Sequence, residues 1–333
     1  MMKSSIIYAV GGLIGLVVVI LLNLRIGAYP VSFHELGQWI AWRAGNGAEP
    51  DKNIVIVIEN IRAPRIIAAL FIGAGLSCAG AAYQSLFRNP LVSPELLAVS
   101  SGAAVGASLA IIFSLSFLML QLSAFMGGII AVCIVLTIAR FAHRREKILA
   151  LVLGGIVVSA LLGSGVSLIK ILADPYEQLP MLTFWLLGSL ARIQNYEIIP
   201  LIPVCIISIG IIIAMRFRID TMTVGDEEAQ TLGIHTGQIR LTVIALATLL
   251  TSVAVSISGI IGWVGLVIPH MTRMIVGPSF GKTGFLSAIL GGLFLLIVDT
   301  VARTIASVEI PLGILTALIG APIFIWLMVK GRE

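Results

Sequence analysis

Charged residues are scarce in this sequence of 333 residues. Asp, Glu, Lys and Arg together make up 11% of it, whereas hydrophobic residues make up 59%. A soluble domain carries about 25% charged residues. So few charges cannot cover a water-facing surface, which excludes soluble enzymes and soluble binding modules. Disorder is excluded too, because the apolar content is high and the net charge low. The sequence therefore predicts an all-α, polytopic membrane protein.

Cysteine is also rare, and no pattern of metal ligands is present. The three cysteines, Cys78, Cys133 and Cys205, each lie within an apolar run. They are expected to be small buried hydrophobic residues, with no disulfide or metal framework. Basic residues interleaved with aromatic residues are missing as well, so nucleic acid is not expected as a partner.

The predicted membrane interior has no acidic residue at mid-span. Glu95, Lys170 and Asp299 all fall within about a turn of the end of a predicted span. A carrier driven by protons or sodium generally needs an ionisable relay near the midplane. A secondary transporter is therefore disfavoured, and the energy for transport is expected to come from elsewhere.

Two features that imitate enzyme motifs do not fulfil them. The segment Gly277–Thr283 has three residues between its glycines, where a phosphate-binding loop needs four, and it follows an apolar helix. An intramembrane hydrolase would need a histidine facing a serine at the same depth, and the sequence places none there. We predict no catalytic residue, no metal site and no cofactor in this chain.

Apolar runs of about 20 residues can cross a bilayer. Ten segments are expected to do so: 5–24, 66–86, 93–111, 115–139, 148–171, 198–215, 240–258, 260–277, 284–302 and 312–329. Loops on the side of the termini carry 13 of the 21 Lys and Arg residues, with a dense cluster at 140–147. Positively charged loops favour the cytoplasm, so both termini are expected to be cytoplasmic.

Three segments are too short or too polar to span. Residues 27–61 form an outside loop with an amphipathic stretch, 183–190 fit a short outside helix, and 216–240 form the longest cytoplasmic segment. Small-residue pairs such as Gly73 and Gly75, and Gly291 and Gly292, predict closely packed helices. Prolines within or beside the spans predict broken helices.

Seven motifs occur in a characteristic order along almost the whole chain. They are IRAPR (61–65), GAGLSCAGAAYQSLFRNPLVSPELLAVSSGAAVGA (73–107), FWLLGSL (184–190), GDEEAQTLGI (225–234), GIIGWVGLVIPHMTR (259–273), VDTVARTI (298–305) and PLGILTALIGAPIFIWLM (311–328). Together they resemble the permease subunits of type II ABC importers for iron chelates, haem and cobalamin. The resemblance implies one transmembrane permease domain over residues 1–333.

The same resemblance implies the partners and the location. The permease is expected to pair with a second copy of itself, two ATP-binding cassette subunits and a periplasmic or lipid-anchored substrate-binding protein. It would lie in the inner (cytoplasmic) membrane, in contact with lipid. ATP and Mg would be bound by the partner subunits, so this chain is expected to be a transport subunit and not an enzyme.

Three groups of residues gain expected roles from the resemblance. Arginines at the outer ends of spans would grip carboxylates of the binding protein, since guanidinium binds them bidentately; they are Arg62, Arg65 and Arg303. A cytoplasmic segment would couple to the ATPase through Gly225, Asp226, Glu227, Glu228, Leu232, Gly233 and Ile234. A cytoplasmic gate is expected at Lys147, Ile148 and Leu149, where apolar residues would exclude water.

The cargo is not fixed by these motifs. A ferric siderophore is the first expectation because siderophore permeases dominate the family. Haem, cobalamin and an oxyanion such as molybdate or tungstate remain alternatives within the family, and a secondary transporter remains a less favoured alternative outside it.

Overall fold

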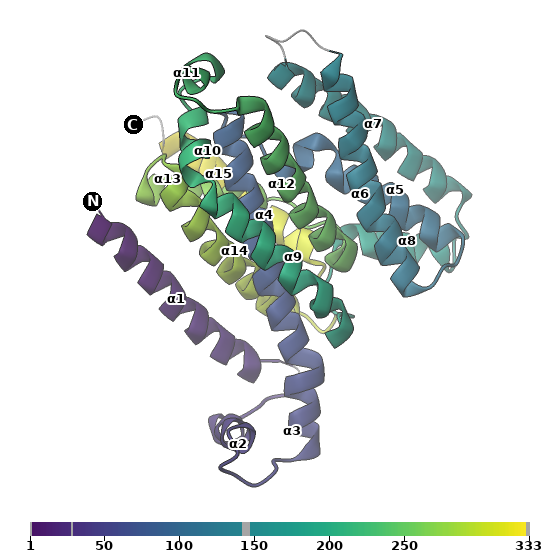
Figure 1. Cartoon of the computed structure of the whole chain (residues 1–333). Helices are drawn as coiled ribbons and strands as arrows, with labels where there is room; N and C mark the ends of the chain where they lie inside the picture. The colour runs from purple at the N-terminus through teal and green to yellow at the C-terminus, as the bar shows by residue number, and fades with distance from the viewer. Residues whose placement is uncertain (1, 28, 142–146, 331–333) are drawn as a thin grey trace.

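Helices make up most of the computed structural model, which describes residues 2–27, 29–141 and 147–330. Within these ranges there is no strand, and the helices pack into one bundle (Figure 1). An α-helix satisfies its own backbone hydrogen bonds, which is what a chain surrounded by hydrocarbon requires. The predicted all-α class is confirmed.

Each of the ten predicted spans contains one helix. These are α1 (Met2–Arg25), α4 (Ala63–Leu86), α5 (Val99–Ile112), α6 (Phe117–Arg140), α7 (Lys147–Leu172), α9 (Asn195–Ala214), α12 (Thr236–Ser258), α13 (Val264–Val276), α14 (Phe280–Ala302) and α15 (Leu312–Lys330). Helices α5 and α13 are short, with 14 and 13 residues. By length and hydropathy alone, six helical segments of the described part could cross a membrane unaided. They contain α4, α6, α7, α9, α12 and α14.

The predicted spans 93–111 and 260–277 are not continuous helices. The first consists of a 3-10 turn, η2 (Pro94–Leu97), and α5, separated by Ala98 with φ +65°. In the second, residues 259–263 are not helical, and α13 starts only after Trp263 with φ +71°. Hydropathy cannot distinguish an unbroken helix from an equally apolar chain that changes direction inside the bundle.

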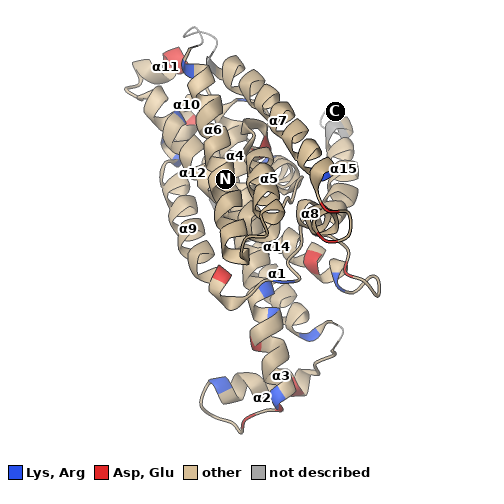
Figure 2. Cartoon of the chain, turned by 90° about the vertical axis from the view of Figure 1, so that its right-hand side faces the viewer, with Lys and Arg blue, Asp and Glu red and all other residues tan. Residues whose placement is uncertain are grey.

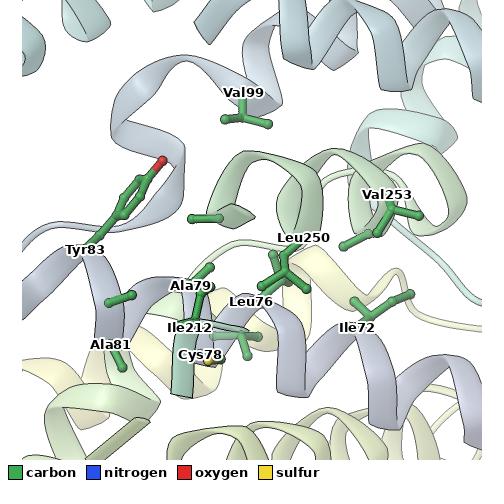
Figure 3. Close-up of a cluster of buried hydrophobic side chains, with 14 of the residues drawn as sticks. Ile72, Leu76, Cys78, Ala79, Ala81, Tyr83, Val99, Ile212, Leu250 and Val253 are labelled. Atoms are coloured by element: carbon green, nitrogen blue, oxygen red, sulfur yellow. The ribbon is translucent and has the colours of Figure 1, made fainter. Parts of the chain in front are cut away.

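Helix α4 lies at the centre of the bundle and is buried along most of its length. A Cβ on Gly73 would lie 2.2 Å from the carbonyl oxygen of Gly291 in α14, and one on Gly80 would lie 1.8 Å from that of Gly265 in α13. The backbones therefore touch, as the small-residue pairs predicted. On another side, Leu76 and its neighbours meet Leu250 and other residues of α12 (Figure 3).

The shorter helices lie at the two ends of the bundle. At one end, here named the α2 end, are α2 (Phe33–Arg43), α3 (Lys52–Ile56) and the π-helical turn η1 (Val57–Arg62) that leads into α4. At the opposite end, the α11 end, are α10 (Arg216–Met222) and α11 (Asp226–Thr231). Helix α8 (Gln178–Leu187) corresponds to the short helix expected at 183–190.

Helix α2 is the predicted amphipathic stretch. Its start is fixed by a capping box, in which Ser32 and Glu35 exchange hydrogen bonds with each other's backbone N–H. The bond from the Ser32 backbone lowers the pKa of Glu35 below its ordinary value. Leu36 is buried, whereas Phe33 and Ile40 are exposed. The apolar side chains that remain exposed suit a helix lying in the membrane interface.

Charged residues gather toward the two ends, and most of the helical length between them carries none (Figure 2). Both ends of the chain lie away from the α2 end (Figure 1). An even number of crossings would give this arrangement, and the cytoplasmic placement of both termini stays a prediction. Residues 142–146 of the basic cluster at 140–147 lie outside the described residues.

We expect Gly80→Val to destabilise the fold because the added side chain would push α4 and α13 apart. Overpacking of this kind costs about 1–3 kcal/mol. The matched control is Gly210→Val in α9, where a Cβ would have no neighbour within 4 Å. Thermal unfolding of the purified protein in detergent should show a lower midpoint for Gly80→Val only. Equal midpoints for the two variants would contradict the backbone contact.

Candidate functional site

The predicted coupling segment, residues 216–240, folds into two short helices that project at the α11 end (Figure 1). Gly225 has φ +136° and forms the turn between α10 and α11. This φ lies in a region that L side chains rarely adopt, so the turn requires glycine. Asp226, Glu227 and Glu228 form the first turn of α11.

Two carboxylates of this segment fasten it to the bundle. Asp226 accepts two hydrogen bonds from Nη2 of Arg240 at 2.7 and 2.8 Å. Asp220 accepts from the backbone N–H groups of Phe280 and Gly281 at the start of α14, at 2.5 and 3.2 Å. The first carboxylate of the predicted acidic group, Asp226, is therefore already used inside the chain.

The other residues of the segment divide into exposed and packed. Glu227 and Glu228 are exposed, and Leu232 is 68% exposed. Gly233 has φ +80° and turns the chain toward α12, and Ile234 packs onto the main core. The segment thus presents two carboxylates and one leucine outward from a fixed base.

The three arginines predicted to dock a binding protein lie together at the α2 end, but they point inward. Arg65 is 7% exposed. Its Nε lies 2.7 Å from Oδ1 of Asp299, and its Nη2 lies 2.6 Å from Oε1 of Glu309. Glu309 also accepts a hydrogen bond from Oγ of Ser189, at 3.3 Å.

Arg62 and Arg303 are likewise occupied. Arg62 is buried and donates to the backbone carbonyls of Leu24 and Tyr29. Nη2 of Arg303 donates to the backbone oxygen and to Oδ1 of Asn23, at 2.9 and 2.6 Å. These contacts tie the end of α1 to α4 and α14.

The inward orientation of the arginines changes what they can do. Their guanidinium groups stabilise the α2 end through partners of this chain and are not displayed on its surface. Docking by Arg62, Arg65 and Arg303 stays a prediction, and it would require them to exchange partners. Sequence reasoning missed Glu309, because only the fold brings it beside a residue 244 positions earlier.

The predicted gate lies at the start of α7. Ile148 is half-buried against the core, and Leu149 is 55% exposed. Lys147 begins the helix, and its side chain lies outside the described residues. The structure thus places two apolar gate residues at the α11 end of a helix that is largely uncovered. The gating role stays a prediction.

The two helix breaks meet each other, and a carboxylate lies between them. A Cβ on Gly262 would lie 3.4 Å from Oε1 of Glu95 in η2, and one on Gly265 would lie 3.0 Å from Cδ of Pro94. Glu95 is exposed on the surface of the chain. Glu95 thus belongs to the η2 turn directly before α5, at the start of the predicted span 93–111.

Comparison with known proteins places this architecture in a family. Residues 15–330 match the model of the FecCD transport family. The molybdate import system permease protein MolB of Haemophilus influenzae is 39% identical over 311 residues, covering 93% of this chain and 91% of MolB. The hemin transport system permease protein HmuU of Yersinia pestis is 36% identical over 339 residues, covering 96% of this chain and 95% of HmuU.

A solved structure shares the fold. It is described as an inward-facing conformation of a metal-chelate type ABC transporter, and it is 35% identical in sequence. The alignment covers 96% of this chain and 98% of the other, with a TM-score of 0.87. The predicted type II permease fold is confirmed.

We expect Arg65→Gln to destabilise the protein by about 3–5 kcal/mol, because it removes the nearest cation from the buried carboxylate of Asp299. The double variant Arg65→Gln with Asp299→Asn should recover part of this loss. Arg43→Gln, which breaks the exposed pair with Glu59, is the control and should change little. Chemical unfolding in detergent measures all three. Similar losses for Arg65→Gln and Arg43→Gln would contradict the buried network.

Proposed function

Because the chain belongs to the FecCD transport family and is thus a permease subunit of an ABC importer, we propose that it imports a metal chelate, with a ferric siderophore as the first candidate. The observation that carries this proposal is the likeness, over 96% of the chain, to a transporter of metal-chelate type. HmuU, a hemin permease by name, adds support for a bulky chelate. MolB keeps a molybdate-type oxyanion as the competing cargo.

The exposed part of the coupling segment supports an ATPase partner at the α11 end. Glu227 and Glu228 stand at the start of α11, where negative charge is favoured by the helix dipole. Leu232 adds an exposed apolar contact beside them. We propose that two ATP-binding cassette subunits bind there, one on each copy of the permease, and supply ATP, Mg and the driving energy.

The uncovered face of α7 supports a second copy of the chain. Among the six helical segments that could span unaided, the one in α7 is the least buried. Only 22% of its most apolar stretch of 18 residues is buried inside the chain. Its exposed side chains include Leu153, Val157 and Leu161. Within this proposal, α7 lies partly against the second permease and partly against lipid.

The orientation follows from the loop charges. We propose an inner-membrane location with both termini and α11 in the cytoplasm, where the more positive loops belong. A periplasmic or lipid-anchored substrate-binding protein then docks at the α2 end.

Reversing the charge of the coupling segment tests the importer mechanism. We expect Glu227→Lys with Glu228→Lys to lower both cargo uptake and co-purification of the ATPase at least tenfold, because the contact loses two carboxylates. The control is Glu49→Lys with Glu177→Lys, which alters two exposed carboxylates outside the coupling segment and should leave co-purification of the ATPase unchanged. Undiminished uptake in the coupling variant would favour a secondary transporter.

Uptake of radiolabelled ferric siderophores tests the cargo. Cells lacking the gene should lose uptake of at least one siderophore, and the restored gene should return it. If the two strains take up each of several siderophores equally, the iron assignment is overturned, while the permease assignment stays in place. Haem, cobalamin and molybdate would then be tested in the same strains.

A further inference from the structure

Glu95 lies about halfway along the length of the bundle, as three neighbouring helices show. A Cβ on Gly265 would contact both Pro94 and the carbonyl oxygen of Leu76. Leu76 is ten residues before the end of α4 at Leu86, about 15 Å along the helix axis. Gly265 is eleven residues before the end of α13 at Val276, about 17 Å by the same rise.

Helix α7 gives the third measure. A Cβ on Gly155 would lie 2.0 Å from the carbonyl oxygen of Leu96, the residue after Glu95. Gly155 is eight residues after the start of α7 at Lys147, about 12 Å along its axis. Half the thickness of a hydrocarbon core is about 15 Å. All three helices therefore place Glu95 close to the middle of the membrane.

The side chain of Glu95 is exposed at this depth. Within the described residues, the structure shows no hydrogen bond or ion pair to its carboxylate, in contrast to Asp299, which is buried against Arg65. A charged side chain facing lipid at the bilayer centre is strongly unfavourable, and such groups face a water-filled cavity or the interior of an assembly. The irregular backbone around it, at Ala98 and at residues 259–263, must also face protein or a water-filled cavity and not lipid.

We infer that Glu95 lines the passage through which the cargo crosses, and that its carboxylate makes this passage unfavourable to anions. The inference deepens the proposed function, on which it rests. In a pair of permeases related by two-fold symmetry, Glu95 and its counterpart would both contribute negative charge to a path with apolar walls. Such a path favours an uncharged or cationic chelate over a small oxyanion, because low-dielectric walls intensify the repulsion.

Charge-selective labelling of a nearby cysteine tests this inference. Ser159 lies on the same face of α7 as Gly155, one turn toward the α2 end, and is half-buried. In the Ser159→Cys variant, the exposed Cys133 is replaced by serine, whereas the buried Cys78 and Cys205 remain. Membrane vesicles carrying the whole transporter are treated with a cationic and an anionic methanethiosulfonate reagent, and the two reaction rates are compared.

We expect the cationic reagent to react faster, and Glu95→Gln to lower the cation-to-anion rate ratio at least fivefold. Glu177→Gln, which neutralises an exposed carboxylate near the start of α8, is the matched control and should leave the ratio unchanged. An unchanged ratio in Glu95→Gln overturns the inference. Protection of the cysteine from both reagents also overturns it, because no water would then reach this level.

Labelling and transport can fail separately. The labelling rates need no cargo, so a lowered ratio together with absent siderophore uptake would leave the anion-repelling passage standing and remove the iron assignment. Normal siderophore uptake with an unchanged ratio would leave the proposed function standing and remove the role of Glu95.

Discussion

The contact of α4 with α13 and α14, backbone against backbone, is the constraint on which the rest of the bundle depends. In hydrocarbon the hydrophobic effect does not drive helices together, so association relies on close van der Waals packing. Gly73 meets Gly291, and Gly80 meets Gly265, at distances that leave no room for a side chain. These contacts hold α4 at the centre, and the remaining helices are arranged around it.

The short α13 and the turn η2 depend on that contact. Non-helical backbone at membrane depth is tolerated only where protein or water satisfies it. The backbone at residues 188–189 is fastened on both sides, since Ser189 N–H donates to Ser258 and Leu312 N–H donates to Gly188, at 2.8 Å each. The break at 259–263 packs against this segment, since a Cβ on Gly188 would lie 2.5 Å from the carbonyl oxygen of Ile260. The other break packs against α13, since a Cβ on Gly265 would lie 3.0 Å from Cδ of Pro94.

Much of the fold could be predicted from the sequence, because the long apolar runs and the small-residue pairs act locally. Ten helices, the amphipathic α2 and the short α11 all follow from composition and spacing. Prolines predicted that some helices are broken, but the positions of the two breaks did not follow, since hydropathy averages over residues 93–97 and 259–263 as if they were helical. The sequence identified Arg65 as a functional candidate. The inward orientation of its side chain depends on Asp299 and Glu309, which only the tertiary fold brings to it.

Asp299 and Glu95 show the two ways in which this membrane protein keeps a carboxylate in its interior. Asp299 lies near the end of α14 and is fully buried, with Arg65 at 2.7 Å and Nε of Arg303 at 3.8 Å. Its charge is neutralised inside the chain, so its effect is on stability. Glu95 has no such partner among the described residues and lies exposed near the midplane. An exposed charge there needs water, and in an importer the passage for cargo supplies it. The same side chain chemistry therefore contributes to the fold at one site and is placed to influence the cargo at the other.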